Sequence, residues 1–385
     1  MRSLELFSGA GGLALGLEDA GFDSVALVER NRSACATLRY NRPDWNIISD
    51  DVRNISFREL GPVDLVAGGP PCQPFSMGGK ANGYEDQRDM FPQAVRAVRE
   101  LEPLAFVFEN VRGLLRPGFR NYVEYIRLQM TYPDFPISKN ADWTTNLQRL
   151  ERHHTSESSE TGLRYKVTIN LANAANFGVP QHRHRVFFVG FRADLNARWF
   201  FPAETHSADE LLYDQYVTGS YWERHGLRKP VNTPESLKPK IRNLESGLLP
   251  TTKPWQTVRD ELSSLGDPRQ KSTWLNHRYQ PGARSYPGHT GSPMDEPSKA
   301  LKAGDHGVPG GENMLRHTNG QIRYFSVREA ARIQKFPDNF EFPGSWTESL
   351  RQLGNAVPVL LASTVVGSVG SKIQPHVRKE TVQSD

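Results

Sequence analysis

Short apolar runs alternate with segments of helical length over the first 110 residues, and this alternation constrains the fold more than any other feature. The apolar runs, each bounded by Gly, Pro, Asp or Asn, cover residues 4–7, 25–29, 46–50, 63–68 and 104–110. Helical spacing marks segments between them, at 13–20, 32–41 and 90–101. Such alternation predicts an α/β fold with a doubly wound, mostly parallel sheet that carries helices on both faces. In sheets of this kind, ligands bind at the carboxyl ends of the strands.

The rest of the chain predicts two more strands and a second region that is rich in loops. Residues 165–171 and 185–191 are apolar runs of strand length, whereas residues 117–164 are polar and irregular and predict a loop. From about residue 195 to 325 the periodicity weakens while Gly, Pro, Trp and His become frequent. This shift in composition indicates a smaller domain that follows the first one.

These patterns give a division of the chain into domains. We expect a ligand-binding domain over residues 1–194 and a smaller, loop-rich domain over residues 195–345, with a hinge helix near residues 325–336. An apolar helix over residues 346–371 is expected to return to the first domain. A polar tail, residues 372–385, ends the sequence.

The scarcity of cysteine excludes several ways of stabilising the chain. Only Cys35 and Cys72 occur in 385 residues, so we expect neither a disulfide framework nor a thiolate zinc cage. The N-terminal stretch is too short in its apolar part for a signal peptide, and no apolar run approaches the ~20 residues of a membrane-spanning helix. The sequence therefore predicts a cytoplasmic protein without a membrane segment. A net charge of +4 permits an anionic partner.

A glycine-rich stretch directly after the first predicted strand suggests a pocket for an adenosine-type ligand. The stretch GAGGLA, residues 9–14, opens a helix and lets a ligand approach the backbone closely. Glu29 ends the second predicted strand, where a carboxylate can bind ribose hydroxyls, and Asp51 follows the third strand. These features fit NAD, FAD and S-adenosylmethionine equally well.

A cysteine and a glutamate follow two further strands and add a chemical function to this pocket. Cys72 lies in GGPPCQPFS, where prolines stiffen the turn, so its thiol could act as a nucleophile rather than as a buried apolar group. Glu109 ends the run LAFVFEN and could donate a proton, or else pair with a cation such as Arg112. Together these groups favour addition to an electron-poor ring, followed by transfer of a group.

Six stretches of the chain resemble, in order, the signature motifs of the cytosine-5 DNA methyltransferase family. They are LELFSGAGGLALGLEDAGF, GGPPCQPFS, FVFENV, NAANFGVPQHRHRVFFVG, VREAARIQKFPD and GNAVPV. One glycine loop alone would be a weak signal, but six motifs in one order are specific. The resemblance implies a Rossmann-like, S-adenosylmethionine-dependent methyltransferase similar to bacterial type II modification methyltransferases. It also implies that the loop-rich domain recognises the target.

The resemblance implies a role for each motif residue. Cys72 attacks C6 of the target cytosine, Glu109 hydrogen-bonds or protonates N3, and Arg183 and Arg185 of QHRHR hold the target nucleotide and its flanking backbone. The residues implied to bind S-adenosylmethionine are Phe7, Ser8, Gly9, Gly11, Gly12, Glu29, Asp51, Val52, Pro71, Asn355 and Ala356. No metal ion is implied. The helix residues Arg328, Glu329 and Arg332 are expected to be structural and to join the two domains.

The implied partner is double-stranded DNA, from which the cytosine must be flipped out because stacking covers its ring faces. Between residues 269 and 335, eleven cations face five acids, an excess of six that suits phosphate contacts, although such charges are more often merely solvated. The cations are Arg269, Lys271, Arg278, Arg284, Lys299, Lys302, Arg316, Arg323, Arg328, Arg332 and Lys335. The sequence identifies no side chain that reads bases.

Three other functions were weighed against a sequence-specific DNA methyltransferase of a restriction-modification system. A transfer-RNA methyltransferase of the same family would carry a Cys-Phe-Thr tripeptide, which does not occur. A catalytically silent DNA-binding homologue would lack the cysteine or the glutamate, and Cys72 and Glu109 are both present. An NAD dehydrogenase leaves these two residues unexplained. We further expect a prokaryotic monomer that shares its DNA site with a cognate restriction endonuclease without forming a stable complex.

Overall fold

The protein folds into two compact units, which a computed structural model describes over residues 1–71, 89–156, 161–247, 251–287, 289–303 and 313–377. The first unit comprises Met1–Ala172, His184–Pro202 and Ala362–Asp385. The second comprises Asn173–Arg183 and Ala203–Leu361. This division differs from the predicted domains, because residues 173–183 and most of the helical region after residue 345 belong to the second unit.

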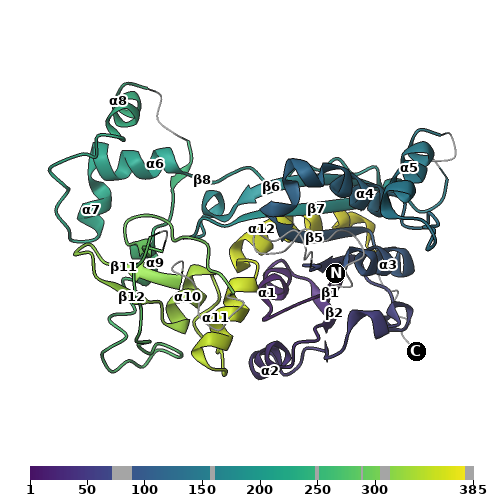
Figure 1. Ribbon diagram of the computed structural model, residues 1–385, viewed down its shortest axis with the longest axis horizontal. Helices are drawn as coiled ribbons and strands as arrows, with labels where there is room; N and C mark the ends of the chain where they lie inside the picture. Colours follow the sequence, from purple (N-terminus) through teal and green to yellow (C-terminus); the bar gives the residue numbers. More distant parts are fainter. Residues whose placement is uncertain (72–88, 157–160, 248–250, 288, 304–312, 378–385) are drawn as a thin grey trace. The chain divides into compact units, whose positions relative to one another are not determined.

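A seven-stranded sheet forms the centre of the first unit in the described residues (Figure 1). Its strands are β1 (Arg2–Leu6), β2 (Asp23–Val28), β3 (Ile47–Ile48), β4 (Leu65–Gly68), β5 (Ala105–Val111), β6 (Tyr165–Asn173) and β7 (His184–Arg192). Their order across the sheet is β3-β2-β1-β4-β5-β7-β6. The first five strands pair in parallel, and β7 pairs with β5 in the antiparallel sense. The predicted doubly wound, mostly parallel sheet is confirmed.

Helices that follow the strands complete the first unit. They are α1 (Gly12–Asp19), α2 (Arg32–Asn41), α3 (Phe91–Leu101), α4 (Arg120–Thr131), α5 (Trp143–His154) and α12 (Val359–Ile373), which begins in the second unit. Phe91 of α3 packs edge-on against Phe188 of β7, with ring centroids 5.5 Å apart. Phe106 of β5 and Tyr165 of β6 make a similar contact at 5.3 Å. Burial of such large rings on the sheet stabilises the unit.

The predicted loop over residues 117–164 is wrong, because this region contains α4 and α5. Its Arg, Gln, Glu and Leu residues are good helix formers, and these polar residues concealed apolar positions at helical spacing. Tyr122, Tyr125 and Ile126 are buried on α4, and Leu147 and Leu150 are buried on α5. Only residues 157–160 of this region lie outside the described part of the chain.

The second unit combines a small sheet with several short helices. Strands β10 (Ser292–Pro293), β11 (Met314–Arg316) and β12 (Ile322–Tyr324) form one sheet, and β8 (His206–Ser207) pairs with β9 (Lys253–Pro254). The helices are α6 (Ala208–Leu212), η8 (Tyr213–Thr218), α7 (Ser220–Arg224), α8 (Lys238–Ser246), α9 (Val258–Leu262), α10 (Val327–Ile333) and α11 (Trp346–Asn355). The helix predicted near residues 325–336 is thus α10, whose N-terminus carries a capping box.

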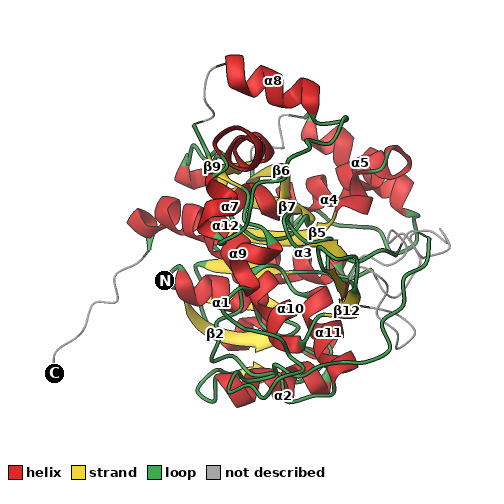
Figure 2. Ribbon diagram, turned by 90° about the vertical axis from the view of Figure 1, so that its left-hand side faces the viewer, coloured by secondary structure: helices red, strands yellow, loops and turns green. Residues whose placement is uncertain are grey.

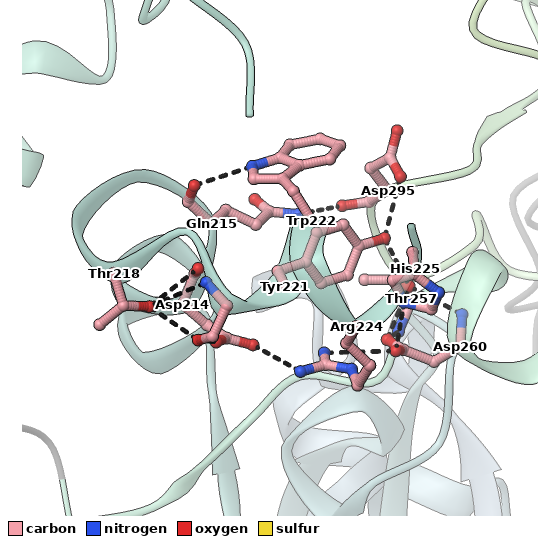
Figure 3. Close-up of polar contacts among 11 residues, drawn as sticks. Asp214, Gln215, Thr218, Tyr221, Trp222, Arg224, His225, Thr257, Asp260 and Asp295 are labelled. Carbon is pink, nitrogen blue, oxygen red and sulfur yellow. Dashed lines mark hydrogen bonds and ion pairs between the residues drawn. The ribbon is translucent and has the colours of Figure 1, made fainter. Parts of the chain in front are cut away.

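A buried polar network joins α7 to α9 in this unit (Figure 3). The Tyr221 hydroxyl lies 3.0 Å from the Thr257 hydroxyl and donates to Asp295 at 2.9 Å. Thr257 forms a capping box with Asp260, which also contacts His225 at 2.8 Å. Because these short helices are too small to be stable alone, the network fixes their mutual position.

One helical stretch would be long and apolar enough to span a membrane by length and composition alone. It covers Trp346–His376, and 67% of its apolar window is buried inside the protein. The sequence prediction had found no such stretch, because α11 and α12 each fall short of the required length. Such burial matches that of helices packed in a protein core. Figure 2 labels the two helices of this stretch, α11 and α12.

Candidate active site

The glycine-rich loop between β1 and α1 has a conformation that few residues other than glycine adopt. Gly9 and Gly11 have φ angles of 54° and 89°, and Phe7 has a φ of 59°. A side chain at Gly11 would also approach the Leu38 Cδ2 atom to 2.6 Å. No side chain caps the N-terminus of α1, so its first-turn amides are oriented as in anion sites of other α/β proteins.

Glu29 lies directly after β2 and holds this loop in place. Its carboxylate accepts hydrogen bonds from the Gly9 amide at 2.8 Å and from the Asn31 amide at 2.6 Å. The Ser8 amide donates to the carbonyl of Val28 at 3.3 Å. The loop and the end of β2 are therefore one rigid element. A contact between Glu29 and a ribose stays a prediction.

Asp51 lies after β3, as predicted, and is bound on both carboxylate oxygens by Arg53. The guanidinium of Arg53 donates to Asp51 Oδ1 at 2.9 Å and to Oδ2 at 2.6 Å. These hydrogen bonds, with one from the Arg53 amide, lower the pKa of Asp51 to about 2. Val52 beside it is buried, and Phe7 packs against the same core cluster. Asp51 is thus held ionised at the carboxyl end of the sheet.

The predicted nucleophile, Cys72, lies outside the described residues, but two hydrogen bonds hold the backbone that precedes it. The Asn110 side-chain amide of β5 donates to the carbonyl of Pro70 at 3.0 Å. The Met90 amide donates to the carbonyl of Pro71 at 3.1 Å. Asn110 is 5% exposed and was not among the predicted site residues, although its place in FVFENV beside Glu109 was an available signal. The two bonds fix the backbone immediately before Cys72.

Glu109 and Arg185 form a buried ion pair between β5 and β7. Their side chains are 10% and 12% exposed. In the antiparallel register Arg185 is opposite Val111, so Glu109, two residues earlier, is a diagonal neighbour on the same face. Burial lowers the pKa of Arg185, and the charge of Glu109 opposes that effect. This ion pair brings together two of the predicted catalytic residues.

The Glu109 carboxylate also lies against the backbone that leads to Cys72. A Cβ atom built on Gly69 would be 3.3 Å from Glu109 Oε2. Glycine at this position therefore lets the carboxylate approach the loop closely. The sequence analysis offered Arg112 as a pairing partner, but the ion pair in the described structure is with Arg185.

Arg183, two residues before Arg185, has a different environment in the second unit. Its side chain is 1% exposed and donates to the carbonyls of Leu301, Gly354 and Ala356 at 2.9, 2.7 and 2.8 Å. The geometry therefore gives Arg183 a structural role. At 1% exposure the side chain of Arg183 is covered by protein, so the predicted contact with the target nucleotide stays a prediction.

Asn355 is exposed at the end of α11, within a buried polar framework. Gln334 donates to the carbonyl of Leu353 at 2.5 Å, and Gln181 accepts from the Leu301 amide at 3.0 Å. Gly354 packs so closely on residues 302–303 that a side chain there would collide with their backbone. Gln181 and Gln334 were not predicted from the sequence, because the partners of their side chains lie more than 15 residues away along the chain.

The α10 residues Arg328, Glu329 and Arg332 are structural, as predicted, but the side-chain contacts described for them lie within the second unit. Arg328 donates to the carbonyls of residues 275, 337 and 340, and Glu329 forms a buried ion pair with Arg323. Arg332 donates to Asp338 through two nitrogens, from Nε to Oδ1 and from Nη2 to Oδ2. The expectation that these residues join two domains is therefore not supported.

Among the residues that the structure describes, no group of three or more His, Cys, Asp or Glu side chains is placed to hold a metal ion. The candidate site instead combines a glycine loop, carboxylates after β2 and β3, and an acid–arginine pair beside the Cys72 loop. These features are typical of an α/β enzyme whose ligand site lies at the carboxyl ends of the parallel strands.

Comparison with known proteins identifies the family. The model of the C-5 cytosine-specific DNA methylase family matches residues 1–138 and 144–371, so the chain belongs to this family and is a DNA (cytosine-5-)-methyltransferase. It is 34% identical over 382 residues to the type II methyltransferase M.NgoMIV of Neisseria gonorrhoeae, covering 98% of each chain. It is 35% identical to M.PspPI of a Psychrobacter strain, covering 94% of this chain and 77% of that one.

Solved structures support the fold. The Dnmt2 methyltransferase of S. pombe is similar with a TM-score of 0.57 and 18% identity, covering 98% of this chain and 100% of the other. The methyltransferase EhMeth of Entamoeba histolytica has a TM-score of 0.54 and 14% identity, covering 97% and 98%. At such identities these likenesses concern the fold alone.

Proposed function

We propose that this enzyme methylates C5 of one cytosine within a short sequence of double-stranded DNA, as the modification enzyme of a type II restriction-modification system. The names of its bacterial relatives, type II methyltransferases over nearly the full length, support this proposal. Its place of action is the bacterial cytoplasm, as a monomer. A cognate endonuclease cleaves the same unmethylated site without a stable complex.

S-adenosylmethionine fits the loop and carboxylates described above, and it supplies the methyl group. The Gly9–Glu29 bond holds the loop open for close approach of a ligand, since a Cβ at Gly9 would meet no atom within 4 Å. The uncapped N-terminus of α1 suits a carboxylate, and Glu29 and Asp51 suit ribose hydroxyls and an adenine amino group. Phe7 and Val52 would supply apolar contacts.

The reaction requires a nucleophile because C5 of cytosine is a poor one by itself. The Cys72 thiolate adds to C6, and the electron pair of the C5–C6 bond becomes available at C5 to take the methyl group. Glu109 hydrogen-bonds N3 of the flipped base, and Arg185 orients Glu109 through their ion pair. Loss of the C5 proton and elimination of the thiolate then restore the aromatic ring.

The observation that carries the proposal is the buried Glu109–Arg185 pair beside the anchored Pro70–Pro71 backbone. Burial of a carboxylate and a guanidinium costs desolvation free energy. A purely structural role seldom explains this cost where the strands of a sheet end, and perturbed ionisable groups cluster at functional sites. Asn110 and Met90 hold the backbone of Pro70 and Pro71, directly before Cys72 in the sequence. We therefore expect the Glu109 carboxyl group and the Cys72 thiol to reach the same cytosine ring.

Cytosine-methylation sequencing tests the proposal in methylation-free bacterial cells that express the wild-type protein, Cys72→Ala or Cys35→Ala. We expect 5-methylcytosine at one short motif with the wild type and with Cys35→Ala, because Cys35 is a buried packing residue. Cys72→Ala should leave no 5-methylcytosine. Methylation retained by Cys72→Ala would refute the nucleophile.

A second measurement separates a wrong substrate from an inactive protein. Duplex DNA that carries 5-fluorocytosine at the motif should form a covalent adduct with the wild type, because fluorine at C5 cannot leave as a proton does. If purified wild-type protein binds S-adenosylmethionine but neither methylates nor traps DNA, the DNA substrate is contradicted. Transfer RNA would then be assayed in the same format.

A further inference from the structure

A 20-residue stretch of the second unit, residues 268–287, contains four cations and no carboxylate, and we call it the basic-aromatic segment. Its sequence is PRQKSTWLNHRYQPGARSYP. The side chains of Lys271, Arg278 and Arg284 are exposed, and Arg269 is 48% exposed beside Asp267. Trp274, Tyr279 and Tyr286 are 38%, 42% and 52% exposed. Cations interleaved with exposed rings are typical of surfaces that bind nucleic acid.

The middle of the segment is fixed to the body of the second unit. Asn276 has a left-handed backbone with φ of 58°, and its side-chain amide donates to and accepts from the Phe342 backbone at 3.0 and 2.8 Å. His277 is 3% exposed and contacts the Ser326 hydroxyl at 2.9 Å. Arg328 binds the carbonyl of Leu275. The exposed side chains on either side are thus displayed from a rigid base.

Four other cations between residues 269 and 335 are engaged inside the protein, which distinguishes them from the cations of the basic-aromatic segment. Of the eleven cations between residues 269 and 335, Arg323 pairs with Glu329, and Arg332 pairs with Asp338. Arg328 is fully buried, and Lys335 pairs with Glu261. These four are engaged within the protein, and of the seven cations that remain, four lie in the basic-aromatic segment, whereas Lys299, Lys302 and Arg316 lie outside it.

Two rings of the segment already lie under guanidinium groups. Arg269 lies over Tyr279 at 5.3 Å from the ring centroid, and Arg332 lies over Trp274 at 4.7 Å. In each pair the guanidinium covers one face of the ring and holds it in place, and the rest of the ring remains exposed to a partner. Core packing does not explain them, because each ring keeps more than a third of its surface in solvent.

We propose that the basic-aromatic segment contacts the sugar-phosphate backbone of the duplex through Lys271, Arg278 and Arg284. This inference rests on the proposed function, since the duplex is the substrate proposed above. Charge complementarity identifies the occupant: a run without carboxylates suits phosphate, whereas a protein surface of mixed charge would find no partner for its own cations. The segment sets affinity and orientation, while the choice of bases lies elsewhere.

The test measures equilibrium binding to a duplex that carries the methylated motif, as a function of KCl concentration, for the triple variant Lys271→Gln, Arg278→Gln and Arg284→Gln. Each lost phosphate contact lowers the slope of log affinity against log salt by about 0.9, so three contacts lower it by about 2.7. Between 50 and 200 mM KCl the wild type should then lose roughly 40-fold more affinity than the variant.

The control is the double variant Arg58→Gln and Arg152→Gln, which removes exposed cations of the first unit that neighbour Glu59 and Glu151. Its slope should equal that of the wild type. Melting temperature and S-adenosylmethionine binding show that each variant is folded.

The outcomes separate two failures. If the wild type methylates DNA but the triple variant keeps the wild-type slope, the segment does not contact the duplex. If the wild type itself neither binds nor methylates DNA, the proposed function fails first. A slope that falls on an RNA duplex of equal length and not on DNA would also overturn the inference.

Discussion

Replacement of Arg183 by lysine tests whether this motif residue holds the second unit together or binds the nucleotide. The guanidinium donates to three buried carbonyls, those of Leu301, Gly354 and Ala356, at 2.7–2.9 Å. Lysine keeps the positive charge but offers one nitrogen in place of a planar fork. It cannot reach all three oxygens, so one or two buried acceptors lose their donor.

The magnitude follows from the number of unsatisfied carbonyls. Each buried acceptor without a partner costs about 1–3 kcal/mol, so the loss of one or two donors in Arg183→Lys should lower the free energy of unfolding by about 1–6 kcal/mol. For a unit of 150–250 residues, 1 kcal/mol shifts the melting temperature by about 2–4 °C, which gives a drop of about 2–24 °C.

Differential scanning calorimetry measures this shift, and Arg185→Lys is the matched control. Arg185 makes one ion pair, with Glu109, and lysine preserves the charge of that pair. Compared with Arg183→Lys, Arg185→Lys should therefore show a much smaller drop in melting temperature and a much larger drop in kcat. The reasoning is refuted if Arg183→Lys melts like the wild type but loses kcat or DNA affinity, since that result would indicate a nucleotide contact.

Three further predictions concern the strand ends. Asn110→Ala frees the Pro70 carbonyl and should lower kcat at least tenfold while the dissociation constant of S-adenosylmethionine, measured by calorimetry, stays within twofold; equal losses in both would contradict a role in the Cys72 loop. Glu29→Gln should weaken that cofactor affinity at least tenfold, and unchanged binding would exclude the pocket. The Asp51 pKa of about 2 is below its ordinary value, so its stabilising contribution is present above pH ~4 and is lost as pH falls through 2. Arg53→Gln should raise this pKa toward 4 in an NMR titration, and a pKa that stays near 2 would show that other groups depress it.

The sheet could be predicted because parallel strands buried on both faces appear as continuous apolar runs. The predicted run 104–110 differs from the observed β5, Ala105–Val111, by a single residue at each end. The helices α4 and α5 could not be predicted by the same signal, since their apolar residues are separated by charged helix formers. On α4 the polar residues Gln129 and Thr131 are buried as well, which further weakens the hydrophobic periodicity of the sequence.

Positions in the site were predictable, whereas the partners of the site residues were not. Glu29 and Asp51 were placed correctly because they follow apolar runs. The pairing of Glu109 with Arg185 joins residues 76 positions apart, and only the register of β5 with β7 determines it. Likewise, Lys335 contributes to the basic excess of residues 269–335 in the sequence, but in the structure it pairs with Glu261, which lies outside that range.

The QHRHR motif shows most clearly why spacing alone does not assign roles. Strand β7 begins at His184, so Arg185 lies within the ladder, opposite Val111, on the face that carries Glu109. Arg183 precedes the strand and belongs to the second unit, where no ladder constrains it and backbone carbonyls surround its side chain. Two arginines with the same chemistry, two residues apart, therefore have different partners: Arg185 pairs with Glu109, and Arg183 binds the backbone carbonyls on either side of Asn355. A substitution in either one would be read as a catalytic defect unless stability and turnover were measured separately.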